Sequence, residues 1–247
     1  MAPRVSAHKG GAERARAATY EAYEDAVTSG AEYAEFDIRR TGDGALVVYH
    51  DGAAGDPGAG RAPLARLDYA GLCAAAGYRV PLVGDVMALL ARHGVAGHLD
   101  LKETGYEAEI AAMAMAAMGP GHFVVTTLED ASVAAVKSAF PQVITALSLG
   151  RDLSGVPWPQ WPRIRASELA PLARVRRCGA DWVAVNYKLA RLGVIRACHR
   201  DGIGVMVWTV DGNAALEEFL GDDRVDVVIT NRPRYATGRR AALRRPG

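Results

Sequence analysis

The sequence predicts a single-domain α/β protein, a (β/α)8 TIM barrel, on the basis of two observations. Short runs rich in β-branched residues alternate with helical stretches along the whole chain of 247 residues, which is typical of βα units around a parallel sheet. Eight such runs can be counted, and chains of roughly 200 to 250 residues commonly form one barrel. A doubly wound open sheet is the alternative, because the periodicity alone does not exclude it.

The N-terminal part predicts a strand, a helix and a second strand. The two strands are expected at residues 4–7 and 33–38. Thr19 fits the N-cap of a helix that continues to Ser29, and Gly30 fits the residue at which that helix stops. This order forms the first βα unit of the barrel.

A hairpin appendage is predicted directly after the second strand. The sequence Thr-Gly-Asp-Gly at residues 41–44 predicts a tight turn, after which residues 46–49 return beside the second strand. The hairpin ends at His50 and Asp51. Residues 52–63 are rich in glycine and proline, so we expect them to be irregular and the best suited to form a mobile loop or lid.

The rest of the chain predicts six more barrel strands, most of them separated by helices of about ten residues. Helical material resumes at Asp68, and a helix over residues 84–92 precedes the third barrel strand. The six strands are expected at residues 98–102, 123–127, 143–148, 182–185, 204–210 and 225–230. The barrel domain is predicted over residues 1–238. A basic, flexible tail is predicted over residues 239–247, and we assign it no function.

The composition indicates which kinds of partner the protein can attract and in which cellular compartment it is expected. The 29 basic and 28 acidic residues give a net charge of +1, so no global field attracts nucleic acid or an anionic membrane. Cys73, Cys178 and Cys198 form no Cys-x-x-Cys pair, which argues against a disulfide framework and a cysteine zinc site. No secretory signal or apolar stretch of membrane-spanning length is present, so we expect a cytoplasmic protein without a transmembrane segment. The oligomeric state is not predicted.

Carboxylates interrupt the strands at their predicted C-terminal ends, where a barrel carries its active site. Glu35 and Asp37 are two apart on a strand and therefore point to the same face. Two inward carboxylates repel each other unless a cation neutralises them, and Asp100 at the end of the next barrel strand can complete a set of three ligands. Such oxygen ligands favour one Mg²⁺ or Ca²⁺ over zinc, with Mn²⁺ as a further candidate. The alternative is a strand with an exposed acidic face.

Histidine and lysine side chains are expected beside these carboxylates. His8 ends the first strand and His50 ends the hairpin, so both can supply general acid and base groups at the same rim. Lys102 is in phase with Asp100 and either contacts a substrate phosphate or pairs with that aspartate. The remaining histidines are interpreted as structural: His93, His98, His122 and His199.

Seven sequence blocks occur in the order found in a known family. They are His8-Lys9-Gly10, Glu35-Phe36-Asp37, Thr41-Gly42-Asp43-Gly44, His50-Asp51, Asp100-Leu101-Lys102, Trp208-Thr209-Val210 and Thr230-Asn231-Arg232-Pro233. In these blocks the chain resembles the glycerophosphodiester phosphodiesterase family, a TIM-barrel group. The resemblance implies His8 and His50 as the acid/base pair and Glu35, Asp37 and Asp100 as metal ligands. It also implies Lys9, Lys102 and Trp208 as substrate-binding residues.

The chain departs from the family pattern at four places. Lys9 replaces an arginine, which keeps the charge but loses the planar fork that binds phosphate through two hydrogen bonds. Asp100 stands where family members usually have glutamate, a Pro-Glu-Asn-Thr block is reduced to Arg-Ala-Ala-Thr at residues 16–19, and the usual insertion after His50-Asp51 is missing. The Asp-Leu-Lys triplet is similar to that of sphingomyelinase D and phospholipase D toxins, in which a substrate hydroxyl attacks phosphorus and a cyclic phosphate forms.

The resemblance implies a divalent-metal-dependent phosphodiesterase of lipid metabolism that cleaves a small glycerophosphodiester-like substrate. Three alternatives stay open at this point. The chain can be a lyase that forms a cyclic phosphate, because an intramolecular attack needs no bound water. It can act on a diphosphate ester, or it can be a non-catalytic barrel that binds a phosphorylated ligand. Which histidine is acid and which is base also stays open.

Overall fold

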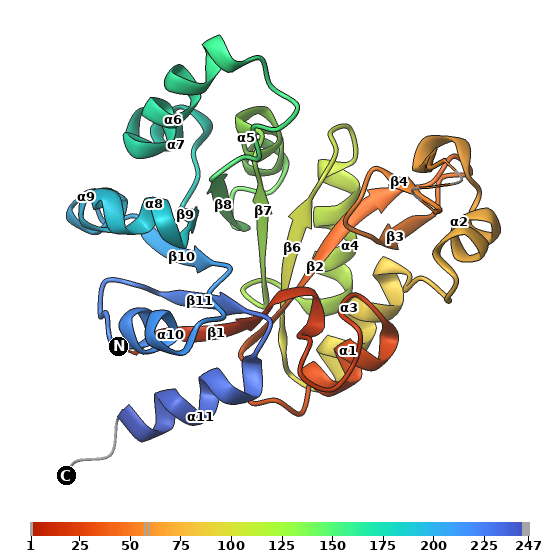
Figure 1. Ribbon diagram of the computed structural model, residues 1–247, viewed down its shortest axis with the longest axis horizontal. Helices are drawn as coiled ribbons and strands as arrows, with labels where there is room; N and C mark the ends of the chain where they lie inside the picture. The colour runs from red at the N-terminus through yellow and green to blue at the C-terminus, as the bar shows by residue number, and fades with distance from the viewer. Residues whose placement is uncertain (1, 57, 59, 244–247) are drawn as a thin grey trace.

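Eight parallel strands close into a barrel in this computed structural model, which describes residues 2–56, 58 and 60–243 (Figure 1). Neighbouring strands follow the order β1-β11-β10-β9-β8-β7-β6-β2, and β1 also pairs with β2, which closes the ring. The barrel strands are β1 (Arg4–Ala7), β2 (Tyr33–Arg40), β6 (Ala96–Leu101), β7 (Phe123–Thr127), β8 (Ile144–Leu149), β9 (Trp182–Asn186), β10 (Gly204–Trp208) and β11 (Val227–Thr230). The predicted TIM barrel is confirmed, and each predicted strand end lies within two residues of the observed one.

Helices cover the outside of the barrel (Figure 1). They are α1 (Tyr20–Ala26), α3 (Val83–Arg92), α4 (Glu107–Met118), α5 (Asp130–Ala139), α6 (Trp161–Leu169), α7 (Leu172–Cys178), α8 (Tyr187–Leu189), α9 (Ile195–Arg200), α10 (Asn213–Leu220) and α11 (Pro233–Leu243). The predicted N-cap is present, because the Thr19 hydroxyl accepts a hydrogen bond from Ala22 N. The helix ends at Ala26 instead of Ser29, since the chain turns there before Gly30 adopts a φ of 81°.

Part of the predicted basic tail belongs to helix α11. It continues to Leu243, so the boundary predicted at residue 239 falls inside a helix. Arg239 pairs with Glu217, and Arg240 pairs with Glu32, which anchors this end of the helix to the barrel. Residues 244–247 of the predicted tail lie outside the described residues.

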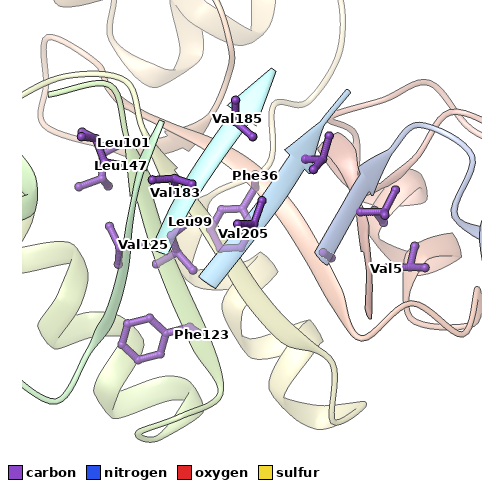
Figure 2. Packing of buried hydrophobic residues seen from close by; sticks show 14 of the residues in the cluster. Val5, Phe36, Leu99, Leu101, Phe123, Val125, Leu147, Val183, Val185 and Val205 are labelled. Carbon is purple, nitrogen blue, oxygen red and sulfur yellow. The ribbon is translucent and has the colours of Figure 1, made fainter. Parts of the chain in front are cut away.

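One face of each barrel strand packs against the helices. Figure 2 shows these side chains, among them Val5, Phe36 and Leu99, which are fully buried. The Tyr23 ring of α1 meets the Phe36 ring edge to face, with 6.2 Å between the ring centroids. Each buried side chain of this size stabilises the fold by about 1.5–3 kcal/mol relative to an exposed one. This alternation leaves every second strand residue to point into the barrel.

Apolar and aromatic side chains fill the N-terminal end of the barrel interior, together with one charged residue, Arg4. There the guanidinium carbon of Arg4 lies 5.0 Å from the ring centroid of Tyr33 and 5.3 Å from that of Trp182. Gly204 leaves room for the indole, because a Cβ at this position would lie 2.3 Å from Trp182. Other buried apolar side chains fill the interior around these residues: Val124, Ala146, Ala184, Met206, Val227 and Ile229. Arg4 apart, the polar side chains that line the active-site cavity lie toward the C-terminal end of the strands.

A hairpin lobe follows β2, as predicted. Its strand β3 (Leu46–Val48) pairs antiparallel with β2, and a second small core holds the lobe together: Val47, Ala54, Leu64, Leu72 and Val80. The helix α2 (Tyr69–Ala76) packs in this lobe, capped by Asp68. The prediction that residues 52–63 are irregular is wrong near both ends of this segment. There β4 (Ala53–Ala54) and β5 (Ala62–Pro63) pair with each other as antiparallel strands. Residues 57 and 59 of that segment lie outside the described residues.

No helix within the described part of the chain is long and apolar enough to cross a lipid bilayer.

Candidate active site

A cavity of about 440 Å³ opens at the C-terminal end of the barrel strands. All eight side chains singled out from the sequence line this cavity: His8, Lys9, Glu35, Asp37, His50, Asp100, Lys102 and Trp208. They come from the ends of β1, β2, the hairpin, β6 and β10, which explains why residues so distant in sequence meet. The structure therefore brings all eight of these side chains together in one cavity.

Three carboxylates form the floor of the site. One oxygen each from Glu35, Asp37 and Asp100 lies within 4.8 Å of the others. The pairing of β2 with β6 produces this cluster, because Asp37 and Asp100 are directly opposite each other in register. Burial, with repulsion from Asp37 and Asp100, raises the pKa of Glu35 well above its usual value. The cluster therefore holds more negative charge than its buried surroundings can stabilise.

Two lysines partly neutralise that charge. Lys102 Nζ lies 2.8 Å from Asp37 Oδ1 and also contacts Asp100, while Lys9 Nζ lies 3.5 Å from Asp37 Oδ2. Burial by itself raises the pKa of Asp37, but the two ammonium groups outweigh it and lower that pKa to about 2. Within the described residues, neither buried oxygen of Asp37 has a partner with hydrogen-bond geometry. An all-oxygen donor set with unsatisfied buried acceptors fits a hard divalent cation.

A tight turn, η1 (His8–Gly10), carries the first two site residues. Lys9 has a φ of 52° and Gly10 a φ of 78°, both in the left-handed region. A Cβ on Gly10 would lie 2.9 Å from the backbone carbon of Ala22, so this position requires glycine. The turn directs the backbone N–H of Lys9 at Glu35 Oε2, at 2.7 Å, and holds that carboxylate in place.

The His8 ring has a defined orientation. Its Nδ1 lies 2.8 Å from Asn231 Oδ1, and Asn231 Nδ2 donates to Asp211 Oδ2 at 2.7 Å. A carboxylate only accepts hydrogen bonds, so the amide nitrogen faces Asp211 and the amide oxygen accepts from Nδ1–H of His8. Nε2 then carries the lone pair, 4.0 Å from Glu35 Oε2. Burial is the largest influence on His8 and lowers its pKa.

The His50 ring lies at the edge of the cavity and is more exposed than His8, at 53% of its side-chain surface against 23%. Its Nδ1 lies 2.7 Å from Asp51 Oδ1, and Arg61 holds the other Asp51 oxygen at 2.5 Å. Hydrogen bonds from His50 and Arg61 lower the pKa of Asp51. Asp51 therefore fixes the ring and leaves Nε2 as its second functional atom.

The model of the glycerophosphoryl diester phosphodiesterase family matches residues 8–235, a range that includes every side chain of the site described so far. The chain belongs to this family. It is accordingly a phosphoric diester hydrolase, as the sequence blocks predicted. No curated protein matches the chain.

Solved phosphodiesterases share the fold. A glycerophosphodiester phosphodiesterase from Parabacteroides distasonis is 19% identical, with a TM-score of 0.77 and 98% of each chain covered. One from Agrobacterium tumefaciens is 20% identical, with a TM-score of 0.73, 95% of this chain covered and 99% of that one. A phosphodiesterase from Oleispira antarctica, in complex with the product sn-glycerol-3-phosphate, is 16% identical, with a TM-score of 0.70 and 96% of each chain covered.

The site also includes a chain of hydrogen bonds that links His98 to Asp100 through Thr126, which the sequence did not predict. Thr126 Oγ1 donates to Asp100 Oδ1 at 2.7 Å, and His98 Nε2 lies 3.1 Å from the same hydroxyl. The hydroxyl has only one proton, so Nε2–H of His98 donates to it, and Ser6 Oγ donates to Nδ1 at 3.1 Å. Burial lowers the pKa of His98 to about 4. His98 was interpreted as structural, yet it lines the cavity and is linked to Asp100 through Thr126; its spacing of two from Asp100 was the available signal.

One wall of the phosphodiesterase cavity comes from the segment between β8 and α6, for which the sequence offered no signal. Glu168 is buried and accepts from the backbone N–H groups of Gly150 and Arg151, at 2.8 and 2.9 Å. Arg165 pairs with Glu168 and donates to the Arg151 carbonyl at 2.9 Å. The predicted Trp208 closes this side, with its Nε1 donating to the carbonyl of β9 residue Ala184 at 2.9 Å.

Proposed function

We propose that the chain cleaves glycerophosphodiesters with the help of one divalent metal ion and the two histidines His8 and His50. One observation carries the proposal: three carboxylates with mutually close oxygens lie in one cavity with two oriented imidazoles and two lysines. Each group is of the type that phosphodiester cleavage needs, namely charge stabilisation and proton transfer.

The carboxylates fit the cation that the family resemblance implies. Glu35, Asp37 and Asp100 would hold it, and their oxygen-only donor set favours Mg²⁺ or Ca²⁺, with Mn²⁺ as a further candidate. When bound, the ion withdraws negative charge from the phosphate and stabilises the charge that develops during cleavage. Lys102 would add positive charge from the same floor, and Lys9 from the η1 turn.

His8 is the proposed general base, and His50 is the proposed general acid. Nε2 of His8 has a lone pair because Asn231 holds the proton on Nδ1, so it can take a proton from the attacking hydroxyl. His50 lies at the exposed edge of the cavity, where Asp51 fixes its ring and a leaving alkoxide can depart to solvent. A proton on Nε2 of His50 would go to that alkoxide.

The substrate is proposed to be a diester of glycerol 3-phosphate. The Oleispira antarctica relative binds sn-glycerol-3-phosphate as a product, and a cavity of about 440 Å³ accommodates a ligand of this size. Water as the attacking group yields the monoester directly. Attack by a hydroxyl of the substrate itself yields a cyclic phosphate first.

Phosphorus NMR of the products tests this proposal. The protein is incubated with a panel of glycerophosphodiesters in Mg²⁺, Ca²⁺, Mn²⁺ or EDTA, and the first phosphorus species is identified. We expect a monoester that forms only with a divalent ion, and no turnover by His8→Ala or His50→Ala. His199→Ala, a substitution of an exposed histidine outside the cavity, is the matched control. Undiminished turnover in EDTA would contradict the metal dependence, and an accumulating cyclic phosphate would replace hydrolysis with the lyase reaction.

A further inference from the structure

The inward face of β6 carries a buried histidine that has no part in the proposed function. Residues Ala96, His98 and Asp100 alternate inward along this strand, and His98 has only 3% of its surface exposed. Its register partner on β7, Val124, belongs to the apolar interior. An imidazole buried in such surroundings lowers stability unless its ring nitrogens have partners, and an apolar side chain would fill the same space without that cost. Filling space therefore does not explain a histidine at this position.

Both nitrogens of the His98 ring have a hydroxyl partner. Ser6 Oγ of β1 lies 3.1 Å from Nδ1, and Thr126 Oγ1 of β7 lies 3.1 Å from Nε2. The same Thr126 oxygen lies 2.7 Å from Asp100 Oδ1. These side chains thus form one continuous chain of hydrogen bonds, from β1 through β6 and β7 to a carboxylate of the proposed metal site.

The direction of these hydrogen bonds follows from the donors that are available. An ionised carboxylate only accepts, so the Thr126 hydroxyl donates its single proton to Asp100, and Nε2–H of His98 donates to the hydroxyl. A second acceptor near the hydroxyl is the Leu99 carbonyl, whose oxygen lies 3.5 Å away, against 2.7 Å for Asp100 Oδ1. The N–H of His98 occupies a lone pair of the hydroxyl, which favours and strengthens the hydrogen bond to the carboxylate.

Two carboxylates of the cluster are each held by a neutral donor, but the donors differ in kind. Glu35 Oε2 accepts from the backbone N–H of Lys9 at 2.7 Å, and the fold itself fixes the direction of that group. Asp100 accepts from a side-chain hydroxyl, whose hydrogen rotates unless another group fixes it. The orientation of Asp100 therefore depends on a side chain that is not itself a carboxylate of the cluster.

We infer that His98 is a positioning residue of the active site, which acts through the Thr126 hydroxyl to hold the Asp100 carboxylate in the orientation that completes the metal-ligand set. Ser6 supports this role because it donates to Nδ1 and so keeps the ring proton on Nε2. The inference rests on the metal site of the proposed function. Removal of a group that orients a metal ligand in this way typically weakens metal binding about ten- to a hundredfold.

Calorimetric titration with Mg²⁺, and separately with Mn²⁺, tests the inference without any substrate. We expect His98→Leu and Thr126→Val, which remove the two donors and keep most of the side-chain volume, each to bind the ions about ten- to a hundredfold more weakly. Thr126→Ser keeps the hydroxyl and should bind them more tightly than Thr126→Val. The controls are Thr127→Val, on the opposite face of the same strand, and His122→Leu, at an exposed histidine outside the cavity; both should bind like the unaltered chain.

The double variant His98→Leu/Thr126→Val distinguishes a positioning role from a packing defect. If His98 acts through the Thr126 hydroxyl, its removal costs little further affinity once the hydroxyl is gone, so the double variant binds the ions about as weakly as Thr126→Val. Independent effects would multiply to a loss of about a hundredfold or more. Circular dichroism shows whether the variants are folded. Multiplied losses in the folded double variant would overturn the inference.

Nitrogen NMR of the His98 ring gives a second measurement, which does not depend on the folding of His98→Leu. We expect the proton on Nε2 in the unaltered chain and a mixture of tautomers in Ser6→Ala. A proton on Nδ1 alone in the unaltered chain would reverse the hydrogen bonds and overturn the inference.

The titrations also distinguish this inference from the proposed function. If the unaltered chain binds neither ion, the proposed metal dependence fails and the inference fails with it. If the unaltered chain binds the ions and cleaves the diester, but folded Thr126→Val and His98→Leu bind the ions with unaltered affinity, the proposed function stands and only the positioning role of His98 is overturned.

Discussion

Asn231 accepts a hydrogen bond from Nδ1 of His8 at 2.8 Å, although the two residues are 223 positions apart in the sequence. Asp211 fixes the amide in turn, through the Asn231 backbone N–H at 2.9 Å and the side chain at 2.7 Å. The tautomer of His8, the proposed base, thus depends on Asn231 and, through it, on Asp211. An imidazole without this partner would populate both tautomers and rotate.

Replacing Asn231 with alanine should lower kcat about ten- to a hundredfold and change KM little, because the substitution misorients the base without touching the phosphate site. Steady-state kinetics over a range of pH would measure both effects. In the pH profile of kcat, the limb assigned to the base should shift to a different pH. Asn213→Ala is the matched control, since Asn213 only accepts a hydrogen bond from Arg232 at an exposed position. Unchanged kinetics in Asn231→Ala would remove the positioning role.

Divalent ions should raise the unfolding temperature of the unaltered protein. An ion at a hundredfold excess over its Kd stabilises the native state by about 2.7 kcal/mol. Glu35→Gln should lose this response, because one carboxylate of the cluster is gone. In EDTA the same variant should unfold at a higher temperature than the unaltered protein, since Glu35 no longer repels Asp37 and Asp100. Differential scanning calorimetry measures both shifts in unfolding temperature, with Glu217→Gln as the control. If divalent ions raised the unfolding temperature of both variants equally, Glu35 would not be a metal ligand.

The buried Glu168 should contribute far more to stability than an exposed glutamate. Glu168→Ala leaves Arg165 and two backbone N–H groups without their partner and should cost about 3 kcal/mol. Glu217→Ala breaks an exposed pair with Arg239 and should cost less than about 1 kcal/mol. Urea denaturation gives the two free energies of unfolding. Similar losses would mean that the β8–α6 segment is not held by Glu168.

The Glu32–Arg240 pair should make stability depend on pH in the acid range. Burial of Glu32 opposes ionisation, but hydrogen bonds from Arg240 and Val5 N outweigh it and lower the pKa below 4.5. The native state then binds fewer protons than the unfolded chain, so the contribution is present above pH 4.5 and is lost as the pH falls. It should amount to less than about 1 kcal/mol, because the group is partly exposed.

Urea titrations at about pH 5 and pH 3 would measure this loss, since the window spans the carboxylate pKa range. Glu32→Gln should lose less free energy of unfolding over the same interval than the unaltered protein. An identical loss in both would exclude Glu32 as the source.

The barrel and the carboxylates Glu35, Asp37 and Asp100 could be predicted from local periodicity, whereas the substrate-binding roles of Lys9 and Trp208 were implied by the resemblance to the family. The spacing of two between Glu35 and Asp37 fixes a shared face on any strand, and the βα order fixes which ends of the strands meet. The spacing of two between His98 and Asp100 likewise places both on one face of β6, but it does not show which groups the buried ring contacts. The link from that ring to Asp100 depends on Thr126, which β7 supplies.

The wall of the cavity after β8 could not be predicted, for a different physical reason. Glu168 reaches back 17 or 18 residues to the backbone of the loop, and no strand or helix period relates these positions. The β4–β5 pair is similar: it has two residues on each strand, too short for alternation to be visible. Contacts of this kind are set by the packing of the completed fold.

The partnership of His8 with Asn231 also has a consequence for synthesis on the ribosome. The first strand, β1, pairs with the last strand, β11, and the loop after β11 supplies the amide that orients the ring. A nascent chain whose residue 231 is still inside the exit tunnel has all three carboxylates and both histidines outside it, yet it cannot close the cylinder. The closed cylinder and the hydrogen bond that orients His8 are therefore completed together, when the last strand pairs with the first.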